Sequence, residues 1–408
     1  TWESCTEQIA DIYRRVLSSA RDERLKVVHV ITTLTTGGAE RQVESIVTHS
    51  QHRQHVIALY GGGGVAESLS AAGYSTEVLN LSGARRLLAL PVLAARLRSL
   101  RPDVVQVHLL SGQLWGLPAA RLAGVQTILS TEHSLMADSI ENRPLTAGLR
   151  RLYLALNRLA TRTVAVSDAT ADRLVRWGVP AERITVIDNG IDFAALTFDS
   201  DARAAIRREL GVTEGTELVG AVGRLEPVKR FPQLLAAIAP TLERGRRELV
   251  IVGAGPLRET LVDLASSLGV AACVHVTGPR PDVPAVLSAF DVLVSSSRDE
   301  TFGMAVVEAV GAGLPAVYAE CPALDELVDE VPGAFRIDIS DDAAEAESIR
   351  VGVELALLAA AGRRLPVPTS VRAAYDIVST TERLDALAAE LAGVEIANAD
   401  GRPVHVGS

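Results

Sequence analysis

Short runs of Val, Ile and Leu recur along the chain, and each is followed by a stretch whose apolar residues have helical spacing. Such runs are typical of strands that are buried on both faces, and the stretches between them predict helices that cover a parallel sheet. The sequence therefore predicts an α/β fold with a doubly wound parallel sheet in the first half of the chain. The strands expected there are 26–32, 54–60, 75–79, 104–108, 126–131 and 163–166.

The same plan is repeated in the second half of the chain. A length of 408 residues is enough for two or three domains, each with its own core. Two doubly wound domains leave a cleft between them, and such clefts are common ligand sites. The strands expected in the second half are 218–222, 248–252, 272–276, 291–295, 315–318 and 334–337.

Breaks in this pattern divide the chain into four parts. An N-terminal helix is expected within 1–24, either as the remnant of an upstream repeat or as a helix that packs across the domains. The first doubly wound domain would cover 25–195, and the second would cover 196–368. The last part, 369–408, would contain a helix over 369–392 that crosses back to the first domain, followed by a tail.

The composition argues against several classes of protein. A net charge of −10 argues against a general nucleic-acid binder, and a 48% hydrophobic content indicates a globular chain. Three cysteines without metal-ligand spacing favour a reducing, cytoplasmic compartment. The sequence shows no apolar run of membrane-spanning length and no secretory signal. The start at Thr1 fits either removal of an initiator Met or excision from a longer chain.

The segment Ser297–Glu308 is the first candidate for chemistry. A predicted strand runs into a polar loop that carries Glu300, and an apolar helix that carries Glu308 follows. In open α/β sheets such turns lie at the carboxyl ends of strands, where ligands bind. A helix N-terminus attracts phosphate, and carboxylates accept hydrogen bonds from sugar hydroxyls. The combination predicts a site for a sugar nucleotide.

Two cations, Arg224 and Lys229, follow another predicted strand, 218–222. The chain contains only two lysines, Lys26 and Lys229, against 38 arginines, so a lysine here favours a specific role. Two cations five residues apart could hold a diphosphate and stabilise the charge of a leaving group without a metal ion. The alternative is an ordinary basic loop.

Five segments, in this order, resemble the retaining glycosyltransferases of family 4, which have the GT-B fold of two Rossmann-like domains. Each segment alone is weakly specific, but together they extend from about residue 25 to about residue 392. The segments are Gly37-Gly38-Ala39-Glu40, Thr131-Glu132-His133, Ser167 with Asn189-Gly190-Ile191-Asp192, Gly223-Arg224-Leu225-Glu226-Pro227-Val228-Lys229, and the pair Glu300 and Glu308.

The resemblance implies a set of donor-site residues. Glu300 would contact hydroxyls of the donor sugar, Glu308 would accept hydrogen bonds from the ribose, and Arg224 with Lys229 would hold the diphosphate. Glu300, Arg224 and Lys229, together with His133, are the implied catalytic residues. The other implied donor-binding residues are Gly37 and Gly38 in a phosphate loop, Thr301, Phe302, Gly303 and Met304 through their backbone N–H groups, and Arg280 beside the base.

Two histidines at predicted strand ends are further candidates. By the same resemblance, His133 would lie near the reacting sugar, and the alternative is a structural histidine. His108 could face the acceptor. His29 lies inside a predicted strand, and we expect it to pack in the core.

The implied protein is a retaining hexosyltransferase. It would move a sugar from a UDP or GDP sugar to a hydroxyl of a glycan, a lipid-linked or a secondary-metabolite acceptor, with no metal or other cofactor. Two alternatives stay open, namely a sugar-nucleotide 2-epimerase on the same fold and a non-catalytic subunit that binds a nucleotide sugar. The basic amphipathic stretch Arg85–Arg101 predicts either peripheral contact with the inner membrane face or a helix that covers the sheet. The oligomeric state stays open.

Overall fold

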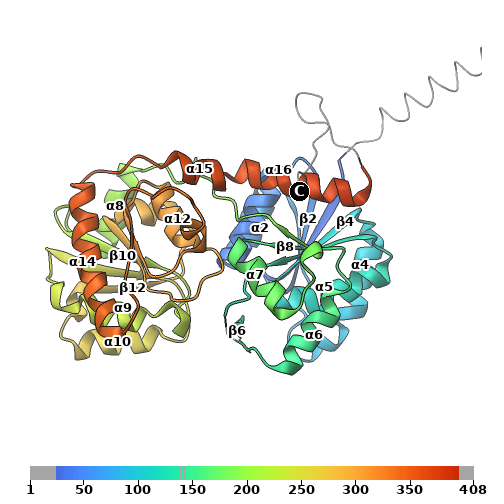
Figure 1. Ribbon diagram of the computed structural model, residues 1–408, viewed down its shortest axis with the longest axis horizontal. Coiled ribbons are helices and arrows are strands. Elements are labelled where there is room, and N and C mark those ends of the chain that lie inside the picture. Colours follow the sequence, from blue (N-terminus) through green and yellow to red (C-terminus); the bar gives the residue numbers. More distant parts are fainter. Residues whose placement is uncertain (1–23, 138, 142, 395–408) are drawn as a thin grey trace, which may run out of the picture.

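The computed structural model describes residues 24–137, 139–141 and 143–394, in which two α/β domains lie side by side (Figure 1). The N-terminal domain contains a seven-stranded sheet with the order β3-β2-β1-β4-β5-β8-β9. All neighbouring strands of this sheet are parallel. The strands are β1 Lys26–Thr33, β2 Arg53–Gly61, β3 Ser75–Val78, β4 Val104–His108, β5 Thr127–Glu132, β8 Arg162–Ala165 and β9 Ile184–Val186.

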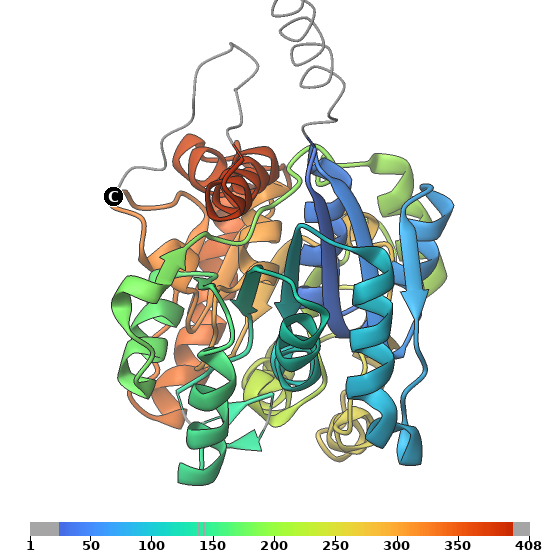
Figure 2. The same cartoon turned by 90° about the vertical axis from the view of Figure 1, so that its right-hand side faces the viewer.

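Helices cover both faces of this sheet (Figure 2). Val28 and Val30 of β1 pack with α4 and α5, whereas Ile31 packs with α2 and α3. The alternation follows from the two-residue period of a strand. A short ribbon of β6 (Ser139–Ile140) and β7 (Arg143–Pro144) lies outside the sheet. The helices are α2 Gly38–His49, α3 Gly64–Ala71, α4 Ala89–Leu100, α5 Leu109–Ala123, α6 Ala147–Asn157 and α7 Asp168–Trp177.

The C-terminal domain repeats the plan with a six-stranded parallel sheet in the order β12-β11-β10-β13-β14-β15. In both sheets the strand order reverses, between β1 and β4 and between β10 and β13. Such reversal points open a crevice for ligands at the carboxyl ends of the strands. The elements are β10 Glu217–Val222, β11 Arg247–Val252, β12 Val274–Gly278, β13 Val292–Ser295, β14 Ala316–Tyr318, β15 Ala334–Arg336, α8 Ser200–Leu210, α9 Phe231–Ile238, α10 Arg258–Ser267, α11 Val283–Ala289, α12 Met304–Gly311, α13 Pro322–Asp325 and α14 Asp342–Ala360.

The chain then crosses back to the N-terminal domain (Figure 1). The predicted helix 369–392 is wrong as a single helix, because it is broken into α15 (Thr369–Tyr375) and α16 (Ile377–Ala392). Asp376 stands at the break in an extended conformation and accepts a hydrogen bond from the Val378 N–H at 2.9 Å. Leu384 and Leu387 of α16 then pack against the start of β1.

The predicted α/β class and the two parallel-sheet domains are confirmed. Each of the twelve predicted strands is present, with its ends shifted by two residues or fewer. The sequence analysis missed α8, α14 and β9. Helix α8 buries little more than Ile206 and Arg207, so its apolar periodicity is weak. The predicted N-terminal helix and the tail fall on 1–23 and 395–408, outside the described residues.

The basic stretch Arg85–Arg101 forms two elements. A 3-10 turn over Gly83–Leu88 precedes α4, and Leu93 and Leu97 of α4 lie in the core of the domain. Leu87 and Leu88 of the turn are exposed, at 84% and 54%. The prediction of a helix that covers the sheet is therefore confirmed for α4. No helix within the described ranges has the length and apolar content needed to cross a bilayer.

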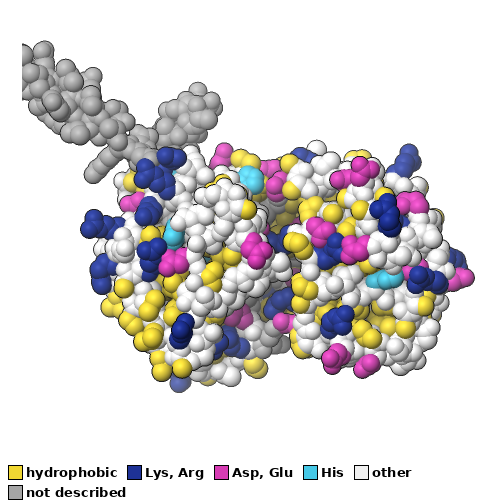
Figure 3. Space-filling view, turned by 180° about the vertical axis from the view of Figure 1, so that it is seen from behind, with side chains coloured by type: hydrophobic (Ala, Val, Ile, Leu, Met, Phe, Trp, Pro, Cys, Tyr) yellow, Lys and Arg dark blue, Asp and Glu magenta, His cyan; other side chains and the backbone are white. Residues whose placement is uncertain are grey.

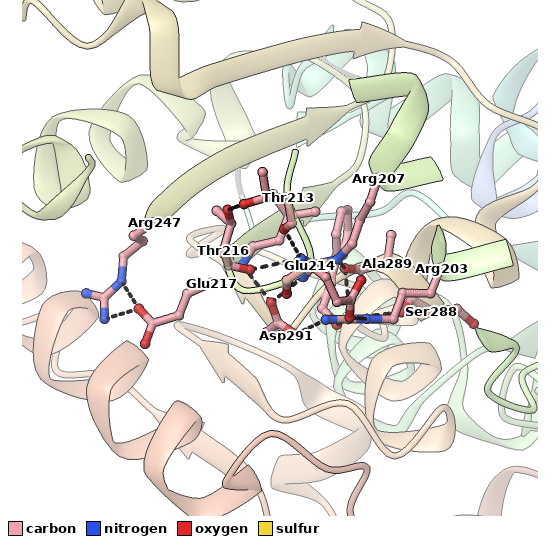
Figure 4. A network of polar contacts seen from close by, with 12 residues as sticks. Arg203, Arg207, Thr213, Glu214, Thr216, Glu217, Arg247, Ser288, Ala289 and Asp291 are labelled. Atoms are coloured by element: carbon pink, nitrogen blue, oxygen red, sulfur yellow. Dashed lines mark hydrogen bonds and ion pairs between the residues drawn. The ribbon is translucent and has the colours of Figure 1, made fainter. Parts of the chain in front are cut away.

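A polar network fixes the start of β13 (Figure 4). The Asp291 carboxylate accepts hydrogen bonds from Arg207 at 2.6 Å, from Arg203 at 2.9 Å and from the Leu218 N–H at 2.7 Å. The side chain of Arg207 is only 2% exposed and also donates to backbone carbonyls, including that of Ala289. Asp291 thus joins α8, β10 and β13.

Elsewhere on this domain, acidic and basic side chains are interspersed over the surface, and a furrow separates it from the N-terminal domain (Figure 3).

We expect Asp291→Ala to lower the free energy of unfolding by about 3 kcal/mol, because it leaves the buried Arg207 charge unpaired. This value is at the low end for a buried pair, since the Asp291 side chain is 23% exposed. Denaturant unfolding measures the loss. The matched control is Glu243→Ala, which removes the partner of exposed Arg246 and should cost less than about 1 kcal/mol. Equal losses in the two variants would contradict a special role for Asp291.

Candidate functional site

The candidate site lies between the domains, where loops leave the carboxyl ends of the parallel strands. The loop from β13 to α12 carries Glu300, and the loop from β10 to α9 carries Lys229. The Lys229 Nζ donates to the Glu300 Oε1 at 2.5 Å. The Ser296 hydroxyl donates to the Lys229 carbonyl at 2.8 Å, which ties the two loops together. Two of the predicted catalytic side chains are thus in direct contact.

The N-terminal domain holds the loop that carries Glu300. The Arg173 guanidinium, on α7, donates to the Glu300 carbonyl at 2.7 Å and pairs with Asp299 at 3.0 Å. The Ala137 N–H donates to the Asp299 carboxylate at 2.9 Å. Sequence analysis missed Arg173, since one arginine on an amphipathic helix cannot be told from a surface arginine. The only hint in the sequence was that Arg173 follows Ser167, a residue of the resemblance, by six positions.

Thr301 continues this contact between the domains. Its hydroxyl donates to the His133 carbonyl at 2.9 Å, and its carbonyl accepts from the Ser167 hydroxyl at 2.6 Å. Ser167 also caps the N-terminus of α7. The structure therefore brings Glu300, Thr301 and His133 together at one point of the cleft.

Backbone geometry dominates the next three residues. The Phe302 side chain is buried and makes an edge-to-face contact with Tyr375, so only its backbone can face a ligand. Gly303 has a φ of 97°, and a Cβ there would lie 2.4 Å from the Cys321 Sγ, so the position requires glycine. Met304 begins α12, whose first N–H groups lack partners within the helix and attract negative charge.

Glu308 and Met304 line a cavity of about 280 Å³ between the domains, together with Arg41. Burial raises the pKa of Glu308 to about 7, and the charge of Arg41 opposes this shift. The Arg41 Nη2 donates to the carbonyls of Arg280 and Pro281 at 3.0 and 2.9 Å. Sequence analysis missed Arg41, although it directly follows the Gly37–Glu40 segment.

The predicted phosphate loop, Gly37 and Gly38, lies at the N-terminus of α2, with Gly37 as the N-cap and Gly38 as the first helical residue. Glu40 folds back over it and accepts hydrogen bonds from the hydroxyls of Thr33 and Thr35 at 2.9 and 3.2 Å. A Cβ on Gly37 would lie 2.4 Å from the Glu40 Oε2, whereas a Cβ on Gly38 would meet open space. The loop is thus shaped by Glu40 around Gly37, and Gly38 faces the open side.

Two predicted donor residues have other partners. Arg224 is half-exposed and pairs with Glu226 at 3.0 Å, not with Glu300. Arg280 pairs with Asp282 at 2.8 Å and with Glu209 at 2.6 Å, and these carboxylates raise its pKa above the ordinary value. Their contacts with a diphosphate and a base stay predictions.

The expectation that His108 could face the acceptor is wrong. Its side chain is fully buried, and its ring lies between those of His29 and His133, so it does not face an acceptor. The reason is its place at the end of a central strand, between His29 of β1 and His133, which directly follows β5. His29 is buried, as expected, but it is also hydrogen-bonded to His108. Across the part of the chain that the structure describes, no group of three His, Cys, Asp or Glu side chains is arranged to hold a metal ion.

We expect Glu308 to make stability depend on pH. The folded-state pKa of Glu308 is about 7, above its ordinary value of 4.5. The stability that the protonated side chain contributes is therefore fully present below pH 4.5 and is lost as the pH rises through about 7. Glu308→Gln mimics the protonated form. Its stability relative to wild type should therefore increase between about pH 5 and about pH 8 in denaturant unfolding. Glu243→Gln, at an exposed site, is the control, and a pH-independent difference for Glu308→Gln would contradict the shift.

Comparison with known proteins agrees with this geometry. Residues 36–195 match the model for "Glycosyltransferase Family 4", and residues 202–351 match the model for "Glycosyl transferases group 1". The structure resembles that of Anabaena HepE in complex with UDP and glucose, with a TM-score of 0.77 and 23% identity. This match covers 90% of the present chain and all of HepE.

Two named relatives are similar in sequence. The D-inositol 3-phosphate glycosyltransferase of Corynebacterium efficiens is 32% identical over 60% of this chain and 59% of its own length. The chain therefore spans under two thirds of that relative. The 2-deoxystreptamine N-acetyl-D-glucosaminyltransferase of Streptomyces fradiae is 30% identical over 66% of this chain and 67% of its own length. The protein belongs to glycosyltransferase family 4 and has the GT-B fold.

Proposed function

We propose that the protein transfers a sugar from a UDP-sugar to a hydroxyl group of a cyclitol acceptor, with retention of the anomeric configuration. The observation that carries this proposal is the contact of Lys229 with Glu300 at 2.5 Å, on a loop that the opposite domain holds in place. A cation for phosphate and a carboxylate for sugar hydroxyls thus lie side by side in the cleft.

The donor would lie along the C-terminal domain. The N-terminus of α12 and Lys229 suit a diphosphate, and Arg224, on the same loop as Lys229, would leave Glu226 to contact it. Glu308, in the adjoining cavity, would accept hydrogen bonds from the ribose. UDP as the nucleotide is supported by the structures of HepE in complex with UDP, with UDP and glucose, and with UDP-glucose.

The acceptor class rests on the relatives. Their names specify D-inositol 3-phosphate and 2-deoxystreptamine, and both compounds are six-membered carbocycles that carry several hydroxyl groups. A cyclitol is the acceptor that these two share.

The chemistry would need no metal ion, because the protein cations offset the charge that develops on the leaving diphosphate. Closure of the two domains would exclude water and limit hydrolysis of the donor. Retention would follow if the leaving phosphate takes the acceptor proton on the same face of the sugar. Peripheral membrane contact is supported only by the exposed Leu87 and Leu88 beside the basic turn.

Incubation of the protein with UDP-glucose or UDP-N-acetylglucosamine, a panel of cyclitols and EDTA tests this function. We expect a glycosylated cyclitol with an α-linkage by NMR. Glu300→Gln should lower kcat/KM by about a hundredfold or more, because it weakens the contact that positions the sugar. Glu243→Gln, far from the cleft and exposed, should not change it.

Other outcomes would favour the alternatives. A changed sugar nucleotide without any acceptor would indicate a 2-epimerase. Binding of UDP-glucose without turnover, unaffected by Glu300→Gln, would indicate a non-catalytic binding subunit. A requirement for added metal ions, or a β-linked product, would contradict the proposed mechanism.

A further inference from the structure

Three imidazoles form a line from the middle of the N-terminal sheet to the cleft. The His29 Nδ1 lies 3.0 Å from the His108 Nε2, and the His108 Nδ1 lies 3.1 Å from the His133 Nε2. Their ring centroids lie 5.3 and 5.4 Å apart, and neighbouring ring planes are inclined by 24° and 28°. Each shared contact is between two ring nitrogens, so the rings form a chain and do not converge on one point as metal ligands would.

At the end of the histidine line that lies away from the cleft, the direction of the hydrogen bonds is fixed by Ser50. The Ser50 hydroxyl donates to the Asp385 carboxylate at 2.8 Å, and its oxygen accepts from the His52 N–H at 3.1 Å and from the Gln54 Nε2 at 2.6 Å. A hydroxyl has one hydrogen and two lone pairs, so these three contacts use all of its capacity. The amide NH₂ of Gln54 therefore faces Ser50.

The orientation of the Gln54 amide determines which nitrogen of His29 carries the proton. Because its NH₂ faces Ser50, its Oε1 faces the His29 Nε2, at 2.7 Å. An amide oxygen can only accept, so the His29 Nε2 carries the proton. In a neutral imidazole the other nitrogen is then an acceptor, and the tautomer is set by the hydrogen bond that the first nitrogen makes.

The same step repeats twice. The His29 Nδ1 accepts from the His108 Nε2–H, and the His108 Nδ1 accepts from the His133 Nε2–H. This requires neutral rings. Burial lowers the pKa of His29 and of His133 to about 4 and that of His108 well below its ordinary value, so all three are neutral at pH 7.

The start of the chain is itself buried. Asp385 lies on α16 and is only 6% exposed, and it also accepts from the Gln51 N–H at 3.1 Å. Burial raises the pKa of Asp385, while the charge of His52 and the donors Ser50 and Gln51 favour its carboxylate form.

We propose that Asp385, Ser50, Gln54, His29 and His108 act as positioning residues that fix His133 as its Nε2–H tautomer. The Nδ1 of His133 is then an acceptor, directed at a hydroxyl group of the sugar that is transferred. The assignment of the ligand hydroxyl rests on the proposed function. The tautomer does not, since it follows from the protein contacts alone.

The location of His133 fits this role. Its backbone carbonyl contacts Thr301 of the opposite domain, and its side chain is partly exposed. Among the described residues its Nδ1 has no hydrogen-bond partner, and it is not one of the buried polar atoms left unpaired. An accessible lone pair in a sugar site selects an O–H group and disfavours a second acceptor.

Replacement of Gln54 gives a direct test, because the side chain at this position sets the direction of the chain. Gln54→Lys places donors only against Ser50 and His29, next to the Asp385 carboxylate. The His29 Nε2 would then accept, each proton along the chain would move to Nδ1, and His133 would present a donor. Gln54→Glu keeps an acceptor and should keep the wild-type tautomers.

Side-chain ¹⁵N–¹H NMR of the full-length protein reads the tautomers without any ligand, with signals assigned from single His→Gln variants. We expect Nε2–H at His29, His108 and His133 in wild type and in Gln54→Glu, and Nδ1–H at His133 in Gln54→Lys. A proton on the Nδ1 of wild-type His133 would overturn the proposal. So would a folded Gln54→Lys protein in which His133 keeps its Nε2–H. If Gln54→Lys does not fold, the wild-type tautomers alone decide.

Binding of UDP and of UDP-glucose by calorimetry then tests the ligand contact. Gln54→Lys should weaken UDP-glucose binding about tenfold or more and leave UDP binding within about twofold. His55→Gln is the control, because His55 is hydrogen-bonded to Ser75 and does not belong to the line of three histidines. Equal weakening of both ligands would overturn the sugar contact. If wild type binds neither ligand, the proposed function fails, but the NMR result still decides whether the protein contacts fix the tautomer of His133.

Discussion

The loop Asp299–Thr301 depends on the opposite domain for its hydrogen bonds. Its carbonyl groups at Glu300 and Thr301 are buried acceptors, and the donors that satisfy them are Arg173 and Ser167 of the N-terminal domain. Buried carbonyl groups without donors are costly, so the conformation of this loop and the contact between the domains stabilise each other. The position of the Glu300 carboxylate, and hence of Lys229 beside it, follows from that contact.

The charges of the site are balanced within the protein. Lys229 and Glu300 neutralise each other, and a partly buried pair of this kind brings little net stability, because both charges lose water. In the proposed reaction this pair would exchange partners with the diphosphate and the sugar hydroxyls. Glu308 is different, since burial raises its pKa to about 7 even though the charge of Arg41 opposes this shift.

Most of the fold could be predicted from the sequence, because buried parallel strands are continuous apolar runs and Gly303 marks a close approach between two segments of the chain. The proximity of Glu300 and Lys229 could be predicted as well, because both lie on loops that leave the carboxyl ends of parallel strands. What could not be predicted depends on long-range contacts. Arg173 and Arg41 are single arginines on helices, and only the folded chain brings them to the loop of Glu300 and to Glu308. The burial of His108 depends on which strands become its neighbours, so its expected acceptor contact was wrong. Helix α8 was missed because its few buried residues include the polar side chain of Arg207.

The two connections between the domains run side by side. The Ile191 N–H donates to the Tyr375 carbonyl at 2.7 Å, and the Ile377 N–H donates to the Ile191 carbonyl at 3.1 Å, so the segments that leave and re-enter the N-terminal domain are joined. Because both connections pass through this point, we expect any movement of one domain against the other to bend the chain here. Such a movement would separate Arg173 from Glu300, whereas Asp385, on α16, would stay with Ser50. Domain movement would thus change the contacts of the Glu300 loop, whereas the hydrogen bonds from Asp385 to His133 join only the N-terminal domain and α16 and would be kept.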